Sequence, residues 1–351
     1  MRVSARTVLL TGVKLTLMVG LLALVLRQVQ WHDVETVNAV GDRVLTPGLG
    51  SALLDLDLKL YGLAVASMAS AVIMSALRWH QVLSLLGLPF RRLEVVNLVF
   101  IGDFFNNFLL GSLGGDAVKV FLAVRNRSRK TIVLTSIFVD RLIGLIGLSL
   151  HAAVMVLLLS SRGTIDPHSL RLAATPIALV VAGLGGGAIL LFSPWVQQAL
   201  GLARMADRIP MGMGKHLGQA GATIRQLFAA PKALLPVFLA TLGCQLFSIT
   251  AVALMGAALD LDLSWVEFFL AVPIIFIIAA VPVTPGGIGV LEELCLIYLA
   301  AAANPNKVLL LALLIRLTML VCGLPGLIAF WRYGHPKVAQ MREELGREEE
   351  G

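Results

Sequence analysis

The sequence predicts a polytopic α-helical membrane protein, and three observations support that prediction. Of the 351 residues, 58% are hydrophobic and only 14% are charged, with a mean hydropathy of +0.89, whereas soluble domains have about 25% charged residues. The apolar runs are long and do not alternate with polar residues, which argues against a β-barrel. Two of the runs are interrupted by glycine and polar residues. We therefore expect an all-α protein with about six full spans and two re-entrant helical segments.

The spans follow from the apolar runs in chain order. A hydrocarbon core of about 30 Å takes roughly 20 residues to cross. The N-terminal run lacks the small-x-small cleavage site of a signal peptide, so we interpret it as a retained span. The six predicted spans are 8–26, 58–77, 131–160, 172–193, 233–257 and 308–331. The charged tail, residues 332–351, is expected to be cytoplasmic and flexible.

The first broken segment, residues 95–116, has a composition that a plain spanning helix avoids. The stretch 102–119 holds two Asp, two Asn, one Ser and four Gly among Phe and Leu. Polar groups at membrane depth are costly, and a glycine-broken helix frees backbone groups that hydrocarbon cannot satisfy. We therefore expect a re-entrant segment that forms half of a substrate site. The alternative is an ordinary cytoplasmic loop between two helices.

The second broken segment, residues 265–303, is interrupted by Pro-Val-Thr-Pro-Gly-Gly-Ile-Gly at 282–289. Thr284 is suited to cap a half-helix that starts at the following proline. The positive end of that half-helix would point into the membrane. Gly286, Gly287 and Gly289 leave room for backbone N–H groups to approach an anion closely. This segment therefore predicts the other half of the substrate site.

The basic residues set the orientation of the chain. With a cytoplasmic N-terminus, nineteen Lys and Arg fall in cytoplasmic segments, six fall on the opposite side, and three lie within spans. The flanks of the first broken segment are then cytoplasmic, and those of the second are on the outer side. The result is an inverted repeat, residues 58–160 and 233–331, of the kind that marks transporter binding sites. The alternative is two ordinary helical hairpins with fortuitous polar residues.

Each half also places an arginine in its closing helix. Arg141 follows Gly115 by 26 residues, and Arg316 follows Gly287 by 29. A charge at the bilayer centre costs about 2.5–3.5 kcal/mol even on the lenient insertion scale, so each arginine needs a partner. A structural ion pair and a lipid phosphate both remain open for Arg141, whereas a structural pair is favoured for Arg316. The candidate partners are Asp103, Asp116, Asp140, Glu292, Glu293 and a lipid phosphate. We predict that Asp116, which is also suited to cap the helix after the first break, faces the same cavity as Arg141 and pairs with it; the alternative partners of Arg141 are Asp140 and a lipid phosphate.

No catalytic constellation appears in the sequence. The six histidines are scattered, the three cysteines lie in apolar stretches without metal-ligand spacing, and no P-loop, HExxH or GxSxG motif is present. We predict no cofactor, no metal and no enzymatic activity. The net charge of +7 suits contact with anionic lipid surfaces and does not imply nucleic acid.

Three motifs resemble the lysylphosphatidylglycerol synthase transmembrane-region family, also called the flippase-like domain family. The resemblance extends over about residues 8–331. The motifs are the run 107–116, the triplet Asp140-Arg141-Leu142 and the run 282–292, and the last is the most specific. Leu110, Lys119 and Asp140 stand where the family pattern has Pro, Arg and Glu. The last two keep the charge, while Leu110 leaves the first break dependent on glycines.

The resemblance implies that residues 1–331 form a domain that moves a phospholipid or other anionic lipid between leaflets. We place it in the cell inner membrane with both termini cytoplasmic. The alternatives are an accessory subunit that presents a lipid precursor to a separate lipid-modifying enzyme, and a membrane glycosyl- or acyltransferase. Bifunctional family members carry a soluble aminoacyltransferase domain after the membrane part, so with only residues 332–351 following, synthase activity is not expected from this chain alone. The candidate lipid-binding residues are Asn107, Gly114, Gly115, Asp116, Lys119, Arg141, Thr284, Gly286, Gly287, Glu292 and Arg316.

Overall fold

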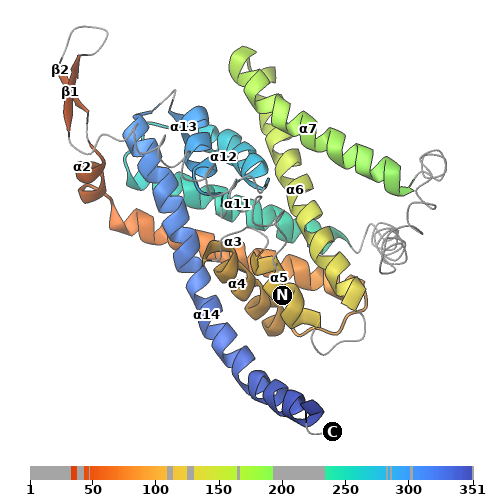
Figure 1. Ribbon diagram of the computed structural model, residues 1–351. Helices are drawn as coiled ribbons and strands as arrows, with labels where there is room; N and C mark the ends of the chain where they lie inside the picture. The colour runs from red at the N-terminus through yellow and green to blue at the C-terminus, as the bar shows by residue number, and fades with distance from the viewer. Residues whose placement is uncertain are drawn as a thin grey trace, which may run out of the picture.

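The computed structural model describes most of the chain, and its described part is almost entirely helical (Figure 1). Ten helices and one two-stranded hairpin lie within the described residues. The predicted first span, 8–26, and the polar segment 195–232 lie outside them. The described residues are 33–37, 43–46, 48–108, 114–124, 130–163, 167–192, 234–281, 284, 287–300 and 303–349.

Four of the predicted spans are confirmed as helices long and apolar enough to cross a membrane. A fifth, 172–193, falls in α7 (Pro167–Phe192), a helix of 26 residues. The four long helices are α3 (Leu58–Leu85), α6 (Lys130–Ser161), α11 (Leu235–Ala258) and α14 (Pro305–Glu349). The protein is therefore a polytopic membrane protein.

Helix α14 corrects the expectation of a flexible tail. It continues from the last span to Glu349 and projects from the bundle (Figure 1). The tail contains five Glu and three Arg, which are good helix formers, and the helix of the last span continues into it. The charge that keeps this segment out of a core does not prevent it from being helical.

A small hairpin precedes the helical core. Strand β1 (Val34–Val37) pairs antiparallel with β2 (Arg43–Thr46), and α2 (Leu49–Leu54) follows. The Oδ1 atom of Asp33 accepts hydrogen bonds from the Gly48 N–H at 2.7 Å and from the Ser51 hydroxyl, which ties the hairpin to α2.

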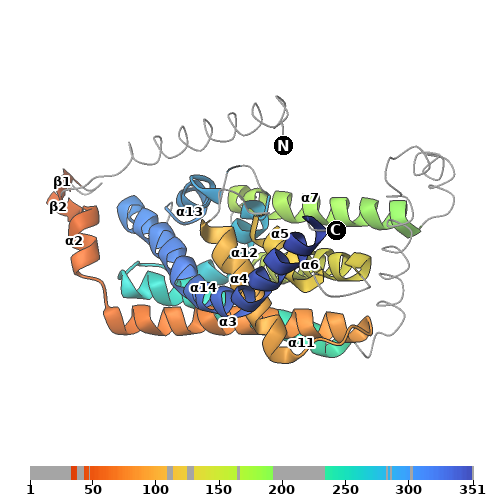
Figure 2. The same ribbon diagram turned by 60° about the horizontal axis from the view of Figure 1, so that its bottom comes forward.

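Helices α3 and α11 form the central pair of the bundle and lie side by side in both views (Figures 1 and 2). Small residues allow this approach: a Cβ added at Gly243 would meet the Met74 sulfur at 3.4 Å. The Ser67 hydroxyl donates to the Phe247 carbonyl at 2.8 Å. Small residues and interhelical hydrogen bonds are what membrane helices use in place of a hydrophobic driving force.

Two helix–break–helix segments lie between the long helices, where the sequence predicted broken helices. The first is α4 (Arg92–Phe108) and α5 (Gly114–Val124); the second is α12 (Trp265–Ala279) and α13 (Val290–Leu299). None of the four helices reaches the roughly 20 residues of a full span.

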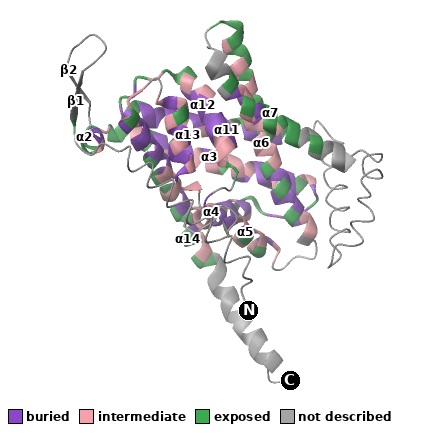
Figure 3. Cartoon of the chain, turned by 45° about the horizontal axis from the view of Figure 1, so that its top comes forward, coloured by how far each residue is buried: buried purple, intermediate pink, exposed green. Residues whose placement is uncertain are grey.

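Each broken segment packs on the closing helix of the other half. Helix α4 lies against α14, where a Cβ at Gly326 would overlap the backbone of Phe100, and α12 lies against α6. Figure 3 shows buried residues concentrated where α3, α11, α12 and α13 meet, while α7 is largely exposed. Large exposed side chains such as Leu157 and Ile328 face outward, as expected of lipid-facing surfaces.

Candidate functional site

Arg141 and Asp116 form an ion pair just after the first break. Arg141 is the twelfth residue of α6, and Asp116 is the third residue of α5. The Arg141 Nη2 atom donates to Asp116 Oδ2 at 2.6 Å, and 58% of the arginine side chain and 18% of the aspartate side chain are exposed. Within the described part of the chain this is the one hydrogen bond that Arg141 donates, so most of its guanidinium N–H groups stay available to a ligand.

Helix α5 is held against α4 by Gly115. A Cβ at this position would overlap the Gly102 carbonyl oxygen and the backbone and side chain of Asn106, so a larger residue does not fit. The Gly115 N–H donates to Asn106 Oδ1 at 3.0 Å. Gly114 is the first residue of the helix, which places Asp116 in the first turn and corrects its expected role as the cap. Both glycines thus position Asp116, and the Gly115 N–H is already used within the protein.

A second ion pair, between Arg78 and Asp140, was missed by the sequence analysis. Helix α3 continues to Leu85, beyond the predicted end at 77, so Arg78 lies inside the helix and not in a cytoplasmic loop. Its Nε and Nη2 atoms donate to the two Asp140 carboxylate oxygens at 2.8 and 3.2 Å, with 9% and 8% of the side chains exposed. The signal was present in the sequence, because buried Val82 and Leu83 continue the apolar pattern after Arg78.

Lys119 completes a balanced group of charges in the first half. It is buried, and its Nζ lies 3.9 Å from the centroid of the Trp79 ring, a cation–π contact. Lys119 also interacts electrostatically with Asp140, Asp116 and Asp103. The group, which we call the first-half charge cluster, contains three cations and three carboxylates: Arg78, Lys119, Arg141, Asp103, Asp116 and Asp140.

The second half contains a matching ion pair that is more enclosed. Arg316 Nε donates to Glu292 Oε1 at 2.8 Å and Nη2 to Oε2 at 3.2 Å, with 24% and 3% of the side chains exposed. Arg316 Nη2 also donates to the Gly287 carbonyl at 3.0 Å, and Glu292 Oε2 accepts the Gly289 N–H at 2.8 Å. Both charged groups are therefore tied to the backbone of the second break as well as to each other.

The second break differs in detail from the prediction. Thr284 is not a helix cap: α13 begins at Val290, after Gly289, and the Thr284 hydroxyl donates to the Ile288 carbonyl at 2.9 Å. The left-handed backbone of Gly287 and Gly289, with φ of 66° and 84°, turns the chain before the helix can start. The Gly287 N–H donates to the Thr284 carbonyl at 3.1 Å, so it does not point at an anion as expected. Gly286 lies outside the described residues.

Asn107 joins the two halves through backbone contacts. Its Nδ2 atom donates to the Asp103 carbonyl at 2.9 Å and to the Met319 carbonyl of α14 at 3.4 Å. The sequence analysis gave Asn107 as a candidate lipid-binding residue; in the structure its amide nitrogen contacts these two backbone carbonyls. Arg141 pairs with Asp116 in the first half and Arg316 pairs with Glu292 in the second, so these charged site residues form two groups, one per half.

Comparison with known proteins adds one finding. Residues 10–326 match the family model described as Lysylphosphatidylglycerol synthase TM region. The match is to the membrane region of that synthase and does not include a catalytic domain. No curated protein matches the chain. The described residues contain no group of three or more His, Cys, Asp or Glu that is suited to hold a metal ion.

Proposed function

The chain belongs to the lysylphosphatidylglycerol synthase TM region family, and from this premise we propose that it moves an anionic phospholipid between the two leaflets of the inner membrane. The family is linked to lipid flipping. The observation that supports the proposal most is the open Arg141–Asp116 pair, which presents guanidinium donors beside a broken helix.

We propose further that the two halves are an inverted repeat with cytoplasmic termini, and the matching positions of the ion pairs support this. Asp116 and Glu292 are each the third residue of the helix after a break, and Arg141 and Arg316 are each the twelfth residue of a closing helix. The partners are separated by 25 and 24 residues. Each arginine lies about 17 Å along its helix from the first residue, which is roughly half of a 30 Å core.

The topology has a direct test. In a variant whose native cysteines are replaced, single cysteines at exposed Arg91 and Asp262 should react with a membrane-impermeant thiol reagent from opposite sides of the membrane. Seventeen basic residues remain in the predicted cytoplasmic segments after the buried Arg78 and Lys119 are removed from the count, against six outside. Reaction of both cysteines from the same side would overturn the inverted repeat.

Lipid binding is proposed to proceed by exchange of partners at Arg141. Without lipid, Asp116 neutralises the arginine. A lipid phosphate carries the same sign of charge and suits the planar guanidinium fork, which binds phosphate in two-point geometry. Asp116, once released, stays within the electrostatic reach of Lys119. The exchange therefore leaves neither Arg141 nor Asp116 as an isolated charge at membrane depth, which is the state that costs most.

The proposal is tested by leaflet-resolved movement of a fluorescent phosphatidylglycerol in proteoliposomes. Arg141→Gln should slow movement at least about tenfold, because it removes the phosphate ligand. Arg141→Lys should slow movement less, because the charge remains without the fork. Arg171→Gln is the matched control, since Arg171 is an exposed arginine of α7.

Two outcomes would count against the transport proposal. Unchanged movement in Arg141→Gln would remove Arg141 from the lipid path. Binding of the lipid without any movement by the wild-type protein would favour the accessory-subunit alternative, in which the protein presents a lipid to a separate enzyme.

A further inference from the structure

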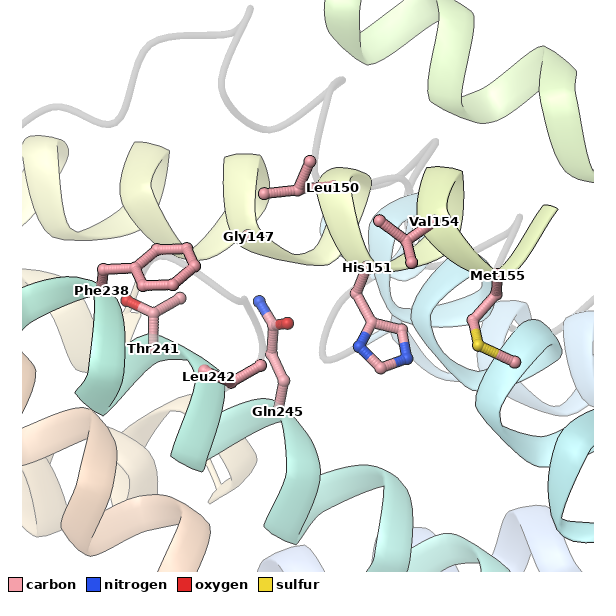
Figure 4. Close-up of a pocket in the computed structure, with 9 residues that line it drawn as sticks. All are labelled: Gly147, Leu150, His151, Val154, Met155, Phe238, Thr241, Leu242 and Gln245. Atoms are coloured by element: carbon pink, nitrogen blue, oxygen red, sulfur yellow. The ribbon is translucent and has the colours of Figure 1, made fainter. Parts of the chain in front are cut away.

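A pocket opens between α6 and α11 (Figure 4). It has a volume of about 200 Å³. The lining residues are spaced at three and four along each helix, so two helix faces form the walls. They are Gly147, Leu150, His151, Val154 and Met155 from α6, and Phe238, Thr241, Leu242 and Gln245 from α11.

The pocket walls are mostly apolar; the Thr241 hydroxyl donates to the Val237 carbonyl at 2.7 Å, but other polar atoms of the lining have no partner among the described residues. Among the described residues, three buried side-chain nitrogen or oxygen atoms lack a hydrogen bond, and two of them, His151 Nε2 and Gln245 Nε2, belong to this pocket. Only 5% of Gln245 is exposed. An unpaired buried polar group costs about 1–3 kcal/mol, and hydrocarbon cannot satisfy it. Figure 4 shows the Gln245 amide directed across the gap toward α6.

We propose that this pocket binds one hydrocarbon chain of a membrane lipid at a point where the chain carries oxygen, an ester carbonyl or a hydroxyl. The Gln245 amide donates to that oxygen. Cavities of about 150 Å³ accept a benzene molecule, so this one has room for a chain segment of at least six carbons. Exposed Leu150, Val154 and Phe238 border it, which leaves a lateral entrance from the bilayer.

This site is separate from the one proposed for transport and does not depend on it. Asp140, Gly144, Gly147 and His151 follow one another at helical spacing on the face of α6 that meets α3 and α11: Asp140 pairs with Arg78, and a Cβ at Gly144 would meet the Arg78 guanidinium at 3.3 Å. Arg141 is one residue further along and therefore about 100° around the helix, where it meets α5.

Three matched probes in detergent test the proposal: decane, methyl decanoate and decanol. The ester only accepts hydrogen bonds, the alcohol donates and accepts, and the alkane does neither. Apparent Tm is measured against the mole fraction of probe in the micelle. We expect the ester and the alcohol to half-saturate the Tm shift at about three- to tenfold lower mole fraction than decane, which corresponds to one net hydrogen bond.

Variants separate the polar requirement from the space. Gln245→Leu should abolish the advantage of the ester and the alcohol while keeping the decane shift, because it removes the donor at similar size. Val154→Phe should reduce all three shifts by filling the pocket. Leu239→Phe, on an exposed position of α11 outside the lining, should change none.

The proposal is overturned if the three probes act equally on the wild-type protein, since the polar nitrogens would then be served by water. It is also overturned if Leu239→Phe lowers the shifts as much as Val154→Phe, because the probes would then act through the micelle. An advantage of the alcohol alone would assign the bound oxygen as a hydroxyl. An advantage shared by the ester would assign it as an ester carbonyl. Lipid movement is not measured in this experiment, so its failure leaves the transport proposal intact.

Discussion

In the first half of the molecule, Arg141 meets Asp116 with 58% and 18% of the two side chains exposed; in the second half, Arg316 meets Glu292 with 24% and 3% exposed. The two pairs occupy corresponding helix positions. The second is joined to the backbone of its break at Gly287 and Gly289, whereas the first relies on one hydrogen bond in the described structure. The Arg316–Glu292 pair is therefore held firmly by the surrounding backbone, whereas we propose that the Arg141–Asp116 pair can exchange its partner.

The surroundings of the two arginines account for the difference. In the first half, the neighbouring Asp140 pairs with Arg78, so the buried ion pair of that half is Arg78–Asp140. This leaves the Arg141–Asp116 pair at the edge of the packed region. In the second half, Arg316 of the closing helix itself forms the buried ion pair, with Glu292. The first half therefore contains an additional, exposed ion pair, and that pair is where we place lipid binding.

The largest loss of stability should come from breaking the Arg316–Glu292 ion pair of the second half. Glu292→Gln keeps the size of the side chain but leaves the Arg316 charge without a counter-ion, and removal of one partner of a buried pair costs about 3–5 kcal/mol. We expect severe loss of stability, measured by SDS-driven unfolding in mixed micelles. Asp116→Asn is the matched change in the first half and should cost less, because Asp103 and Asp140 still interact electrostatically with Arg141. Equal losses in the two variants would show that the pairs are equivalent.

A smaller effect is expected from the helix contact that positions Asp116. In Gly115→Ala the new methyl group would overlap the Gly102 carbonyl and the Asn106 backbone, and overpacking of this kind costs about 1–3 kcal/mol. The helix α5 should shift away from α4 and carry Asp116 with it. Gly62→Ala in α3 is the control, because no atom lies within 4 Å of the added carbon. The same unfolding measurement should show Gly62→Ala to be neutral or stabilising by up to about 1 kcal/mol.

The sequence predicted the parts of this arrangement that depend on composition. Four spans, both breaks and the two intramembrane arginines were recognisable because glycines, prolines and charges are conspicuous within apolar runs. The family resemblance rested on those same residues and is confirmed over residues 10–326.

What could not be predicted depends on tertiary geometry. The Asp116–Arg141 pair was predicted and is confirmed, but the pairing of Asp140 with Arg78 was not, because it depends on how α3 and α6 are rotated toward each other. Arg78 was placed in a loop, since a charge at the end of an apolar run is usually the end of the span; here Asp140 on another helix makes its burial tolerable. The start of α13 was set five residues too early, because a Thr-Pro pair signals a helix start while the two left-handed glycines delay it.

The smallest effect on stability, and the sharpest test of the comparison, concerns Asp116 and Arg141 together. A double-mutant cycle with Asp116→Asn and Arg141→Gln measures their coupling free energy. We expect a smaller coupling free energy than in the matched Glu292→Gln and Arg316→Gln cycle, because Asp103 and Asp140 remain near Arg141 when Asp116 is neutral.

Added lipid should have its largest effect at the Asp116–Arg141 pair, the pair with the smaller coupling free energy. The reason is that a lipid phosphate and the Asp116 carboxylate compete for the Arg141 guanidinium. Added phosphatidylglycerol should raise the apparent Tm of the wild-type protein. It should raise the apparent Tm of Asp116→Asn at a lower lipid concentration, because the competing carboxylate is gone. It should leave the apparent Tm of Arg141→Gln unchanged. Phosphatidylglycerol should act on Arg171→Gln as on the wild type, which controls for the loss of a positive charge. A coupling of several kcal/mol at Asp116 and Arg141, with the lipid response unchanged in Arg141→Gln, would make the first pair a structural joint like the second, and the lipid phosphate would then need another ligand.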